Sequence, residues 1–200
     1  MSGFLLGFDV GSSSVKAALL DAHTGRCVAC AQYPKTEMGF VSAHPGFAEQ
    51  NPDDWWECMK RAAQQLKKLS AEGMKNVSAV GISAQMHGLV VVGEDRKPLR
   101  FAIIWNDSRA VGIGEQALEA IGKRYCLNHF LNSPGNFTAT RLRWVKENEP
   151  EIFARIHRMM LPSDYLVMKL TGELSTTASS LSEGILWDYI DEEPAGRIME

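Results

Sequence analysis

The chain has 200 residues, of which 45% are hydrophobic and 22% charged, and its formal net charge is −3. These proportions are typical of a globular protein with one core, so we expect one domain, with at most a small insertion. The slightly acidic balance gives no electrostatic reason to bind nucleic acid or an anionic membrane. The apolar N-terminal stretch lacks a basic flank and is interrupted by Asp9, which excludes a signal peptide and a membrane span and makes the cytoplasm the expected location.

Three consecutive strands are predicted at 4–10, 14–21 and 26–33, because apolar runs alternate there with short turns of small polar residues. The third strand contains Cys27 and Cys30, which have the spacing of a C-x-x-C pair. A separation of three places the two thiols on opposite faces of a strand, and no second pair accompanies them. We therefore interpret them as small buried residues rather than as a metal or redox site.

The first long helix is predicted to begin after Asn51, which can cap it, with Pro52 in its first turn. The apolar residues recur at helical spacing and predict one buried stripe: Trp55, Met59, Ala62, Leu66 and Leu69. A buried strand is predicted at 77–83 and a hairpin-like pair at 89–92 and 99–104.

The second half of the chain alternates helical and extended patterns. Helices are predicted at 109–121, 138–147 and 151–157, a strand at 158–161, and a further helix that begins near Ser163 and Asp164 and ends at Gly172. Thr138 is the expected cap of the second of these helices. Strands that come first and then alternate with helices predict an α/β domain with a mixed sheet.

The turn between the first two strands has the composition of a phosphate-binding turn. Asp9 ends the first strand, Gly11 allows a tight turn, and small serines leave room for a phosphate to reach backbone N–H groups (Ser12, Ser13 and Ser14). Asp9 can hold a metal ion beside those phosphates, and Lys16 adds a positive charge. The turn is not a Walker loop, because a strand follows it, and an ordinary hairpin is the alternative interpretation.

Three polar motifs follow apolar strands: Asp9-Val-Gly-Ser-Ser, Gln85-Met-His-Gly and Trp105-Asn-Asp. Ligands of open α/β sheets bind beyond strand ends, so the three motifs are expected to face one cleft. Alone, a histidine such as His87 is more often structural, and a tryptophan in a strand is more often part of the core.

Taken together, these motifs resemble the FGGY family of carbohydrate kinases. The resemblance covers nearly the whole chain and includes, in order, the N-terminal hairpin, Glu49–Pro52 followed by Trp55-Trp56, Ser83–Gly88, Trp105–Asp107, Asn136–Trp144 and Pro162–Tyr165. It implies an actin-like (ribonuclease H-like) ATPase fold. Gln85–Gly88 together with Trp105–Asp107 resembles the members that phosphorylate D-xylulose, which implies D-xylulose 5-phosphate as the product.

The resemblance also implies site residues and cofactors. ATP and Mg²⁺ would be held at Asp9, Gly11, Ser12, Ser13, Ser14 and Lys16, with the metal bound to Asp9 through water. The sugar would contact Met86 and His87, with Trp105 as an apolar wall, Asp107 as a partner of hydroxyl groups and Asn136 on the substrate side.

One departure from the family is large, because its members are more than twice this length. The catalytic aspartate of the family lies in a second domain, so the resemblance implies that residues 1–200 are the N-terminal domain, that the base lies beyond Glu200, and that this chain alone is inactive. A kinase for another ketose or polyol remains open, as does a non-catalytic sugar-sensing or actin-like module. Apolar surface normally covered by a second domain could also produce a homodimer.

Overall fold

The computed structural model describes residues 3–199, and within them the chain divides into two compact units. The first contains the residues up to Gly39 together with Asn51–Gln85, and the second contains Phe40–Gln50 and the residues from Met86 onward. No helix in this described part of the chain is long and apolar enough to cross a membrane.

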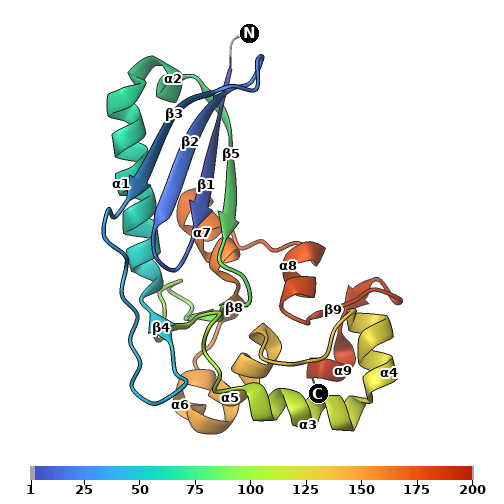
Figure 1. Cartoon of the computed structure of the whole chain (residues 1–200). Coiled ribbons are helices and arrows are strands. Elements are labelled where there is room, and N and C mark those ends of the chain that lie inside the picture. The colour runs from blue at the N-terminus through green and yellow to red at the C-terminus, as the bar shows by residue number, and fades with distance from the viewer. Residues whose placement is uncertain (1–2, 200) are drawn as a thin grey trace. The chain divides into compact units, whose positions relative to one another are not determined.

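The first unit is built on a four-stranded mixed sheet (Figure 1). Its strands are β1 (Phe4–Val10), β2 (Val15–Asp21), β3 (Cys27–Tyr33) and β5 (Val77–Ala84), in the order β3-β2-β1-β5. β1 and β3 both pair antiparallel with β2, whereas β5 pairs parallel with β1. The three strands predicted from the N-terminal sequence are confirmed to within one residue.

Helix α1 (Pro52–Leu69) lies along one face of this sheet and contacts its first three strands. Its start is confirmed, because the side chain of Asn51 accepts a hydrogen bond from Asp53 N at 3.2 Å and Pro52 occupies the first turn. Trp55 and Leu66 are fully buried against the sheet, but Leu69, at the helix end, is 65% exposed and does not belong to the stripe. The short helix α2 (Ala71–Lys75) follows.

The other face of the sheet is open, which corrects two expectations. β5 was predicted to be buried, but it is an edge strand whose residues are mostly exposed, Val80 at 42%. The cysteines Cys27 and Cys30 were interpreted as buried, and both are exposed on the opposite edge strand, β3. Strand sequences report which residues are apolar, but the position of a strand within its sheet decides how much of it is covered.

The second unit consists of short strands and helices. Its strands are β4 (Glu49–Gln50), β6 (Val90–Val92), β7 (Ala102–Ile103), β8 (Arg158–Met160), β9 (Trp187–Asp188) and β10 (Glu193–Pro194). Its helices are α3 (Val111–Ile121), α4 (Lys123–Tyr125), a short π-helix (Cys126–Phe130), α5 (Thr138–Asn148), α6 (Pro150–Phe153), α7 (Pro162–Thr171), α8 (Ala178–Glu183) and α9 (Gly196–Met199).

The predicted hairpin-like pairing is present as antiparallel bridges, which join Leu89 to Ile103 and Val92 to Pro98. The sequence did not predict the longer-range pairings, in which β6 pairs antiparallel with the distant β8 and β7 pairs with β4. Thr138 is the first residue of α5 and not its cap, and α7 begins at Pro162 rather than at Ser163. α7 ends as predicted at Gly172, which adopts a left-handed conformation with φ 79°.

Candidate active site

The turn that joins β1 and β2 is closed by a single backbone hydrogen bond, from Gly11 N to Ser14 O at 3.0 Å. Gly11 does not have a positive φ, and a Cβ there would lie 3.5 Å from that oxygen, so its backbone conformation does not require glycine. Because the N–H of Gly11 is used inside the turn, a phosphate would be held by later residues. The N–H groups of Ser13 and Ser14 donate to no protein acceptor within residues 3–199.

Asp9 and Lys16 stand opposite each other in the β1–β2 register, at the end of the strands that leads into this turn. Their side chains form an ion pair at 3.3 Å, and both are more than half exposed. Such a pair contributes little to stability, because water screens it. Both charges are therefore accessible to a ligand at the turn. One exposed carboxylate fits a Mg²⁺ ion that keeps several waters and receives its other ligands from phosphates.

In the second unit, the loop after β5 places His87 in a left-handed conformation, with φ 61°. This conformation is uncommon for a non-glycine residue, and here hydrogen bonds on both sides maintain it. His87 N donates to Glu183 Oε1 at 2.7 Å, and the carbonyl of His87 accepts from the guanidinium of Arg141. The ring packs edge-on against Phe137 at 4.5 Å between centroids. Met86, one residue earlier, is 55% exposed.

Arg141, on α5, connects the loops that carry the sequence-predicted sugar residues. Its side chain is fully buried, and it donates to the backbone carbonyls of His87, Trp105 and Asp107, the last two at 3.0 and 3.3 Å. Burial lowers the pKa of Arg141 to about 10, with nearby Asp107 acting in the opposite direction. One guanidinium therefore fixes three carbonyls from two separate loops.

The residues predicted from the Trp105–Asp107 motif divide into one exposed and one buried side chain. Trp105 is 52% exposed while its backbone is held by Arg141, so its indole is presented to solvent. Asn136 donates to the carbonyl of Asp107, and its Oδ1 is buried without a partner among residues 3–199. Asn136 therefore lies beside the Trp105–Asp107 loop.

The structure does not support the expectation that Asp107 binds sugar hydroxyls. This carboxylate is fully buried, and it accepts from Ala48 N at 2.5 Å, from Arg109 N at 2.9 Å and from the guanidinium of Arg109 at 2.7 to 3.0 Å. Arg109 lies between the rings of Phe47 and Trp144, at 3.8 and 4.7 Å from their centroids. Asp107 therefore organises the core of the second unit and has no free oxygen to offer a ligand.

Two other carboxylates have structural environments. Asp164 is buried in the first turn of α7, where desolvation raises its pKa even though a hydrogen bond from Thr176 at 2.9 Å acts against the rise. Asp188, at the end of β9, accepts from Tyr125, from His129 and from backbone N–H groups of the following turn. Both carboxylates are thus engaged in hydrogen bonds within the second unit.

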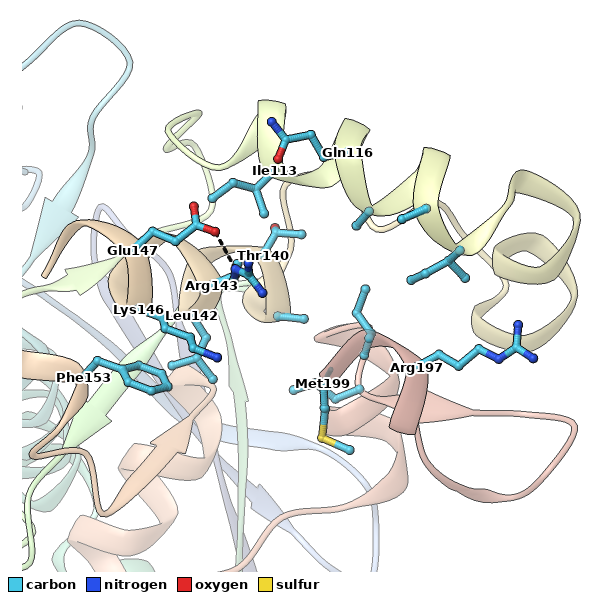
Figure 2. A pocket seen from close by; sticks show the side chains of 16 residues that line it. Ile113, Gln116, Thr140, Leu142, Arg143, Lys146, Glu147, Phe153, Arg197 and Met199 are labelled. Atoms are coloured by element: carbon cyan, nitrogen blue, oxygen red, sulfur yellow. Dashed lines mark hydrogen bonds and ion pairs between the residues drawn. The ribbon is translucent and has the colours of Figure 1, made fainter. Parts of the chain in front are cut away.

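An apolar groove of about 440 Å³ lies elsewhere in the second unit, between α3, α5 and α9 (Figure 2). Ile113, Leu142 and Met199 line it, and the Arg143–Glu147 ion pair lies at its rim. None of the residues predicted from the sequence contributes to this groove, so it is separate from the candidate site.

Sequence reasoning missed two residues that organise the site, Arg141 and Glu183. For Arg141 a signal was present, because it lies on the buried stripe of α5 with Thr138 and Val145, where a charge requires a polar partner. Glu183 gave no signal, because it lies 96 residues from His87 in a short helix whose pattern is not amphipathic.

Comparison with known proteins agrees with the α/β fold described above. Residues 4–193 match the N-terminal domain of the FGGY family of carbohydrate kinases. The xylulose kinases of Escherichia coli and Bacillus subtilis are 37% and 33% identical to the chain, over 91% and 92% of it, but over only 36% of their own length.

Solved structures give the same result. The crystal structure of a xyloylose kinase from Brucella ovis superposes with a TM-score of 0.87 at 32% identity, covering 98% of this chain and 40% of that one. A glycerol kinase from Plasmodium falciparum, solved with ADP, has a TM-score of 0.86 at 18% identity, a likeness of fold alone. The chain thus spans well under half the length of the relatives it matches, and the expected α/β, actin-like fold with its mixed sheet is confirmed.

Proposed function

The chain belongs to the FGGY family of carbohydrate kinases, and on this premise we propose that the full-length protein transfers the γ-phosphate of ATP to a ketopentose. D-xylulose is the first candidate, with D-xylulose 5-phosphate and ADP as products. The observation that carries the proposal is the joint presence of an accessible Asp9–Lys16 turn and of a loop with an exposed Met86 beside a half-buried His87, in a chain whose named relatives are xylulose kinases.

At the turn, the backbone N–H groups of Ser13 and Ser14 would donate to phosphate oxygens, and Lys16 would neutralise part of their charge. Asp9 would hold Mg²⁺ through water, and the ion would supply further neutralisation of the phosphates during transfer. Ser12 and Gly11 would shape the turn so that the phosphate can approach it.

In the second unit, a sugar presents hydroxyl groups and an apolar edge. His87 can hydrogen-bond a hydroxyl, and the exposed Met86 and Trp105 side chains supply apolar surface for the carbons. Asn136 would complete the set from its position beside the Trp105–Asp107 loop. Asp107 is not included, because its oxygens are already used.

A kinase for a different sugar or polyol is the second candidate, and it has a specific basis. The same fold occurs in a gluconate kinase from Lactobacillus acidophilus, with a TM-score of 0.87 at 21% identity, and in the Plasmodium glycerol kinase. Because the fold is shared, it does not select the substrate, and the choice depends on a few side chains in the sugar site. Use of ATP as phosphate donor makes the cytoplasm the proposed location.

Calorimetry on the full-length protein with pentuloses, hexuloses, gluconate and glycerol tests the substrate. We expect D-xylulose to bind most tightly and to give sugar-dependent release of ADP. Tighter binding and faster turnover of another compound would replace the substrate, and binding without any turnover would favour a sugar-sensing module.

The role of the turn is tested by Asp9→Asn in the same protein. Loss of the carboxylate should lower kcat/KM for MgATP about 100-fold, because one charged group of the phosphate site is lost, and should leave sugar affinity without nucleotide unchanged. Glu37→Gln is the matched control, since Glu37 is an exposed carboxylate of the same unit that lies outside the β1–β2 turn. Equal activity of the two variants would remove Asp9 from the site. We also propose that a polypeptide ending at residue 200 releases no ADP with xylulose.

A further inference from the structure

The backbone and ring of His87 are held by one residue of a distant helix, Glu183 at the end of α8. The side-chain Oε1 of Glu183 accepts the N–H of His87 at 2.7 Å, and its backbone carbonyl lies 3.2 Å from the ring Nδ1. Arg141 binds the carbonyl of His87 on the opposite side. Every hydrogen-bonding group of His87 except Nε2 therefore has a partner in the described part of the chain.

These contacts determine the tautomer of the histidine. A backbone carbonyl can only accept a hydrogen bond, so Nδ1 must carry the proton that lies between His87 and Glu183. In the neutral imidazole Nε2 then has a lone pair and no proton. Nε2 has no protein partner within residues 3–199 and is not among their buried unsatisfied atoms, so it remains open to a ligand.

We propose that Glu183 is a positioning residue that holds His87 in its left-handed conformation and presents Nε2 as a hydrogen-bond acceptor to a hydroxyl group of the sugar. The proposal rests on the proposed kinase function for the identity of the ligand, but its structural part stands independently. It deepens that function by stating the direction of the bond: the sugar hydroxyl donates, and its oxygen stays free to accept from another group.

The carboxylate is the part of Glu183 that a substitution can remove. A left-handed backbone is unfavourable for a non-glycine residue, and the charge-assisted bond to His87 N offsets that strain. Without the carboxylate, His87 can relax to an ordinary φ and move its ring away from the carbonyl of Glu183. Glutamine retains an acceptor oxygen at the same reach and should hold the conformation.

The first test is spectroscopic and needs no sugar. In the full-length protein labelled with ¹⁵N-histidine, at pH 8, the His87 ring should show the Nδ1–H tautomer, assigned by the signal lost in His87→Asn. Glu183→Gln should keep that signature, and Glu183→Ala should shift the ring toward the Nε2–H form. An Nε2–H tautomer in the unsubstituted protein would overturn the proposal, whatever the enzyme's substrate.

The second test is kinetic. Glu183→Ala should raise KM for the ketose about tenfold and leave KM for ATP unchanged, as expected for the loss of one charge-assisted hydrogen bond. Glu183→Gln should lie within about threefold of the unsubstituted enzyme, and Glu173→Ala, an exposed carboxylate near α8, should have no effect. The double variant of Glu183→Ala and His87→Ala should be no worse than His87→Ala alone, because the two residues act as one unit.

The two tests separate the possible failures. If the tautomer is as proposed but no ketose is phosphorylated, the kinase assignment fails and the positioning role stands. If a ketose is phosphorylated but the effects of Glu183→Ala and His87→Ala are independent and additive, the positioning role fails and the kinase assignment stands.

Discussion

Replacing the buried Arg141 by methionine should destabilise the second unit more than replacing the half-exposed Arg143 of the same helix by methionine. Arg141 is fully buried and donates to the carbonyls of His87, Trp105 and Asp107. Methionine fills a similar volume but cannot donate, so each of the three carbonyls loses its bond from Arg141, although that of Asp107 keeps its bond from Asn136. A carbonyl left dry and unpaired costs about 1 to 3 kcal/mol.

The desolvation cost of the buried Arg141 charge acts in the opposite direction and reduces the net loss in the free energy of unfolding. Burial lowers the pKa of Arg141 from its ordinary value to about 10, which corresponds to roughly 3 kcal/mol against the charged form. Methionine removes that cost. Because the lost bonds outweigh the relief, we expect Arg141→Met to lower the free energy of unfolding by about 2 to 4 kcal/mol.

Urea unfolding followed by circular dichroism measures this loss. Arg143→Met is the matched control, because Arg143 is two residues along α5, is half exposed, and pairs only with Glu147 across one helical turn. That control should stay within about 0.5 kcal/mol of the unsubstituted chain. Arg141→Lys should fall between the two, since one ammonium cannot reach three carbonyls. A loss for Arg141→Met as small as that of Arg143→Met would refute the reasoning.

Two further predictions concern stability. Because the pKa of Asp164 is raised in the folded state, its favourable contribution to stability is complete below pH 3.8 and is lost as the pH rises through the folded-state pKa. The free energy of unfolding should therefore fall over this pH range relative to that of Asp164→Asn, which urea unfolding at a series of pH values can measure. A difference between the two proteins that does not change with pH would contradict this prediction. Gly114→Ala should lower the thermal midpoint by several degrees, because the new Cβ would lie 1.9 Å from Gly135 O. Gly112→Ala in the same helix is the control: its Cβ would meet nothing within 4 Å, so the substitution should be neutral or slightly stabilising. Equal midpoints of the two variants would show that the Gly135 loop moves aside freely.

Local sequence signals predicted the elements of the first unit well. Alternating apolar residues and small turns located β1 to within its observed bounds, Phe4–Val10, and the Asn51-Pro52 pair located the start of α1. These signals depend on neighbours within one turn or one strand, so they can be recognised without knowing the rest of the fold. The Asp9–Lys16 turn was predicted for the same reason, because both residues belong to one hairpin.

Long-range contacts decided the strand pairing and the side-chain burial that local patterns did not predict. β6 is bridged to the segment that follows it, as predicted, but it also pairs with β8, nearly seventy residues later. β5 is exposed because it lies at an edge of its sheet. Asp107 had the residue type of a sugar ligand, yet the fold buries it against Arg109. Strand pairing and side-chain burial depend on which distant segments meet, and no local pattern encodes that.

The sequence by itself determined the family motifs, the first three strands and the start of α1. Only the tertiary structure showed that Arg141 and Glu183 hold His87 from its two sides. The physical reason is that Arg141 and Glu183 lie 54 and 96 positions from His87, so their hydrogen bonds to it form only after the intervening chain has folded. No local sequence pattern therefore predicts which residues position the site.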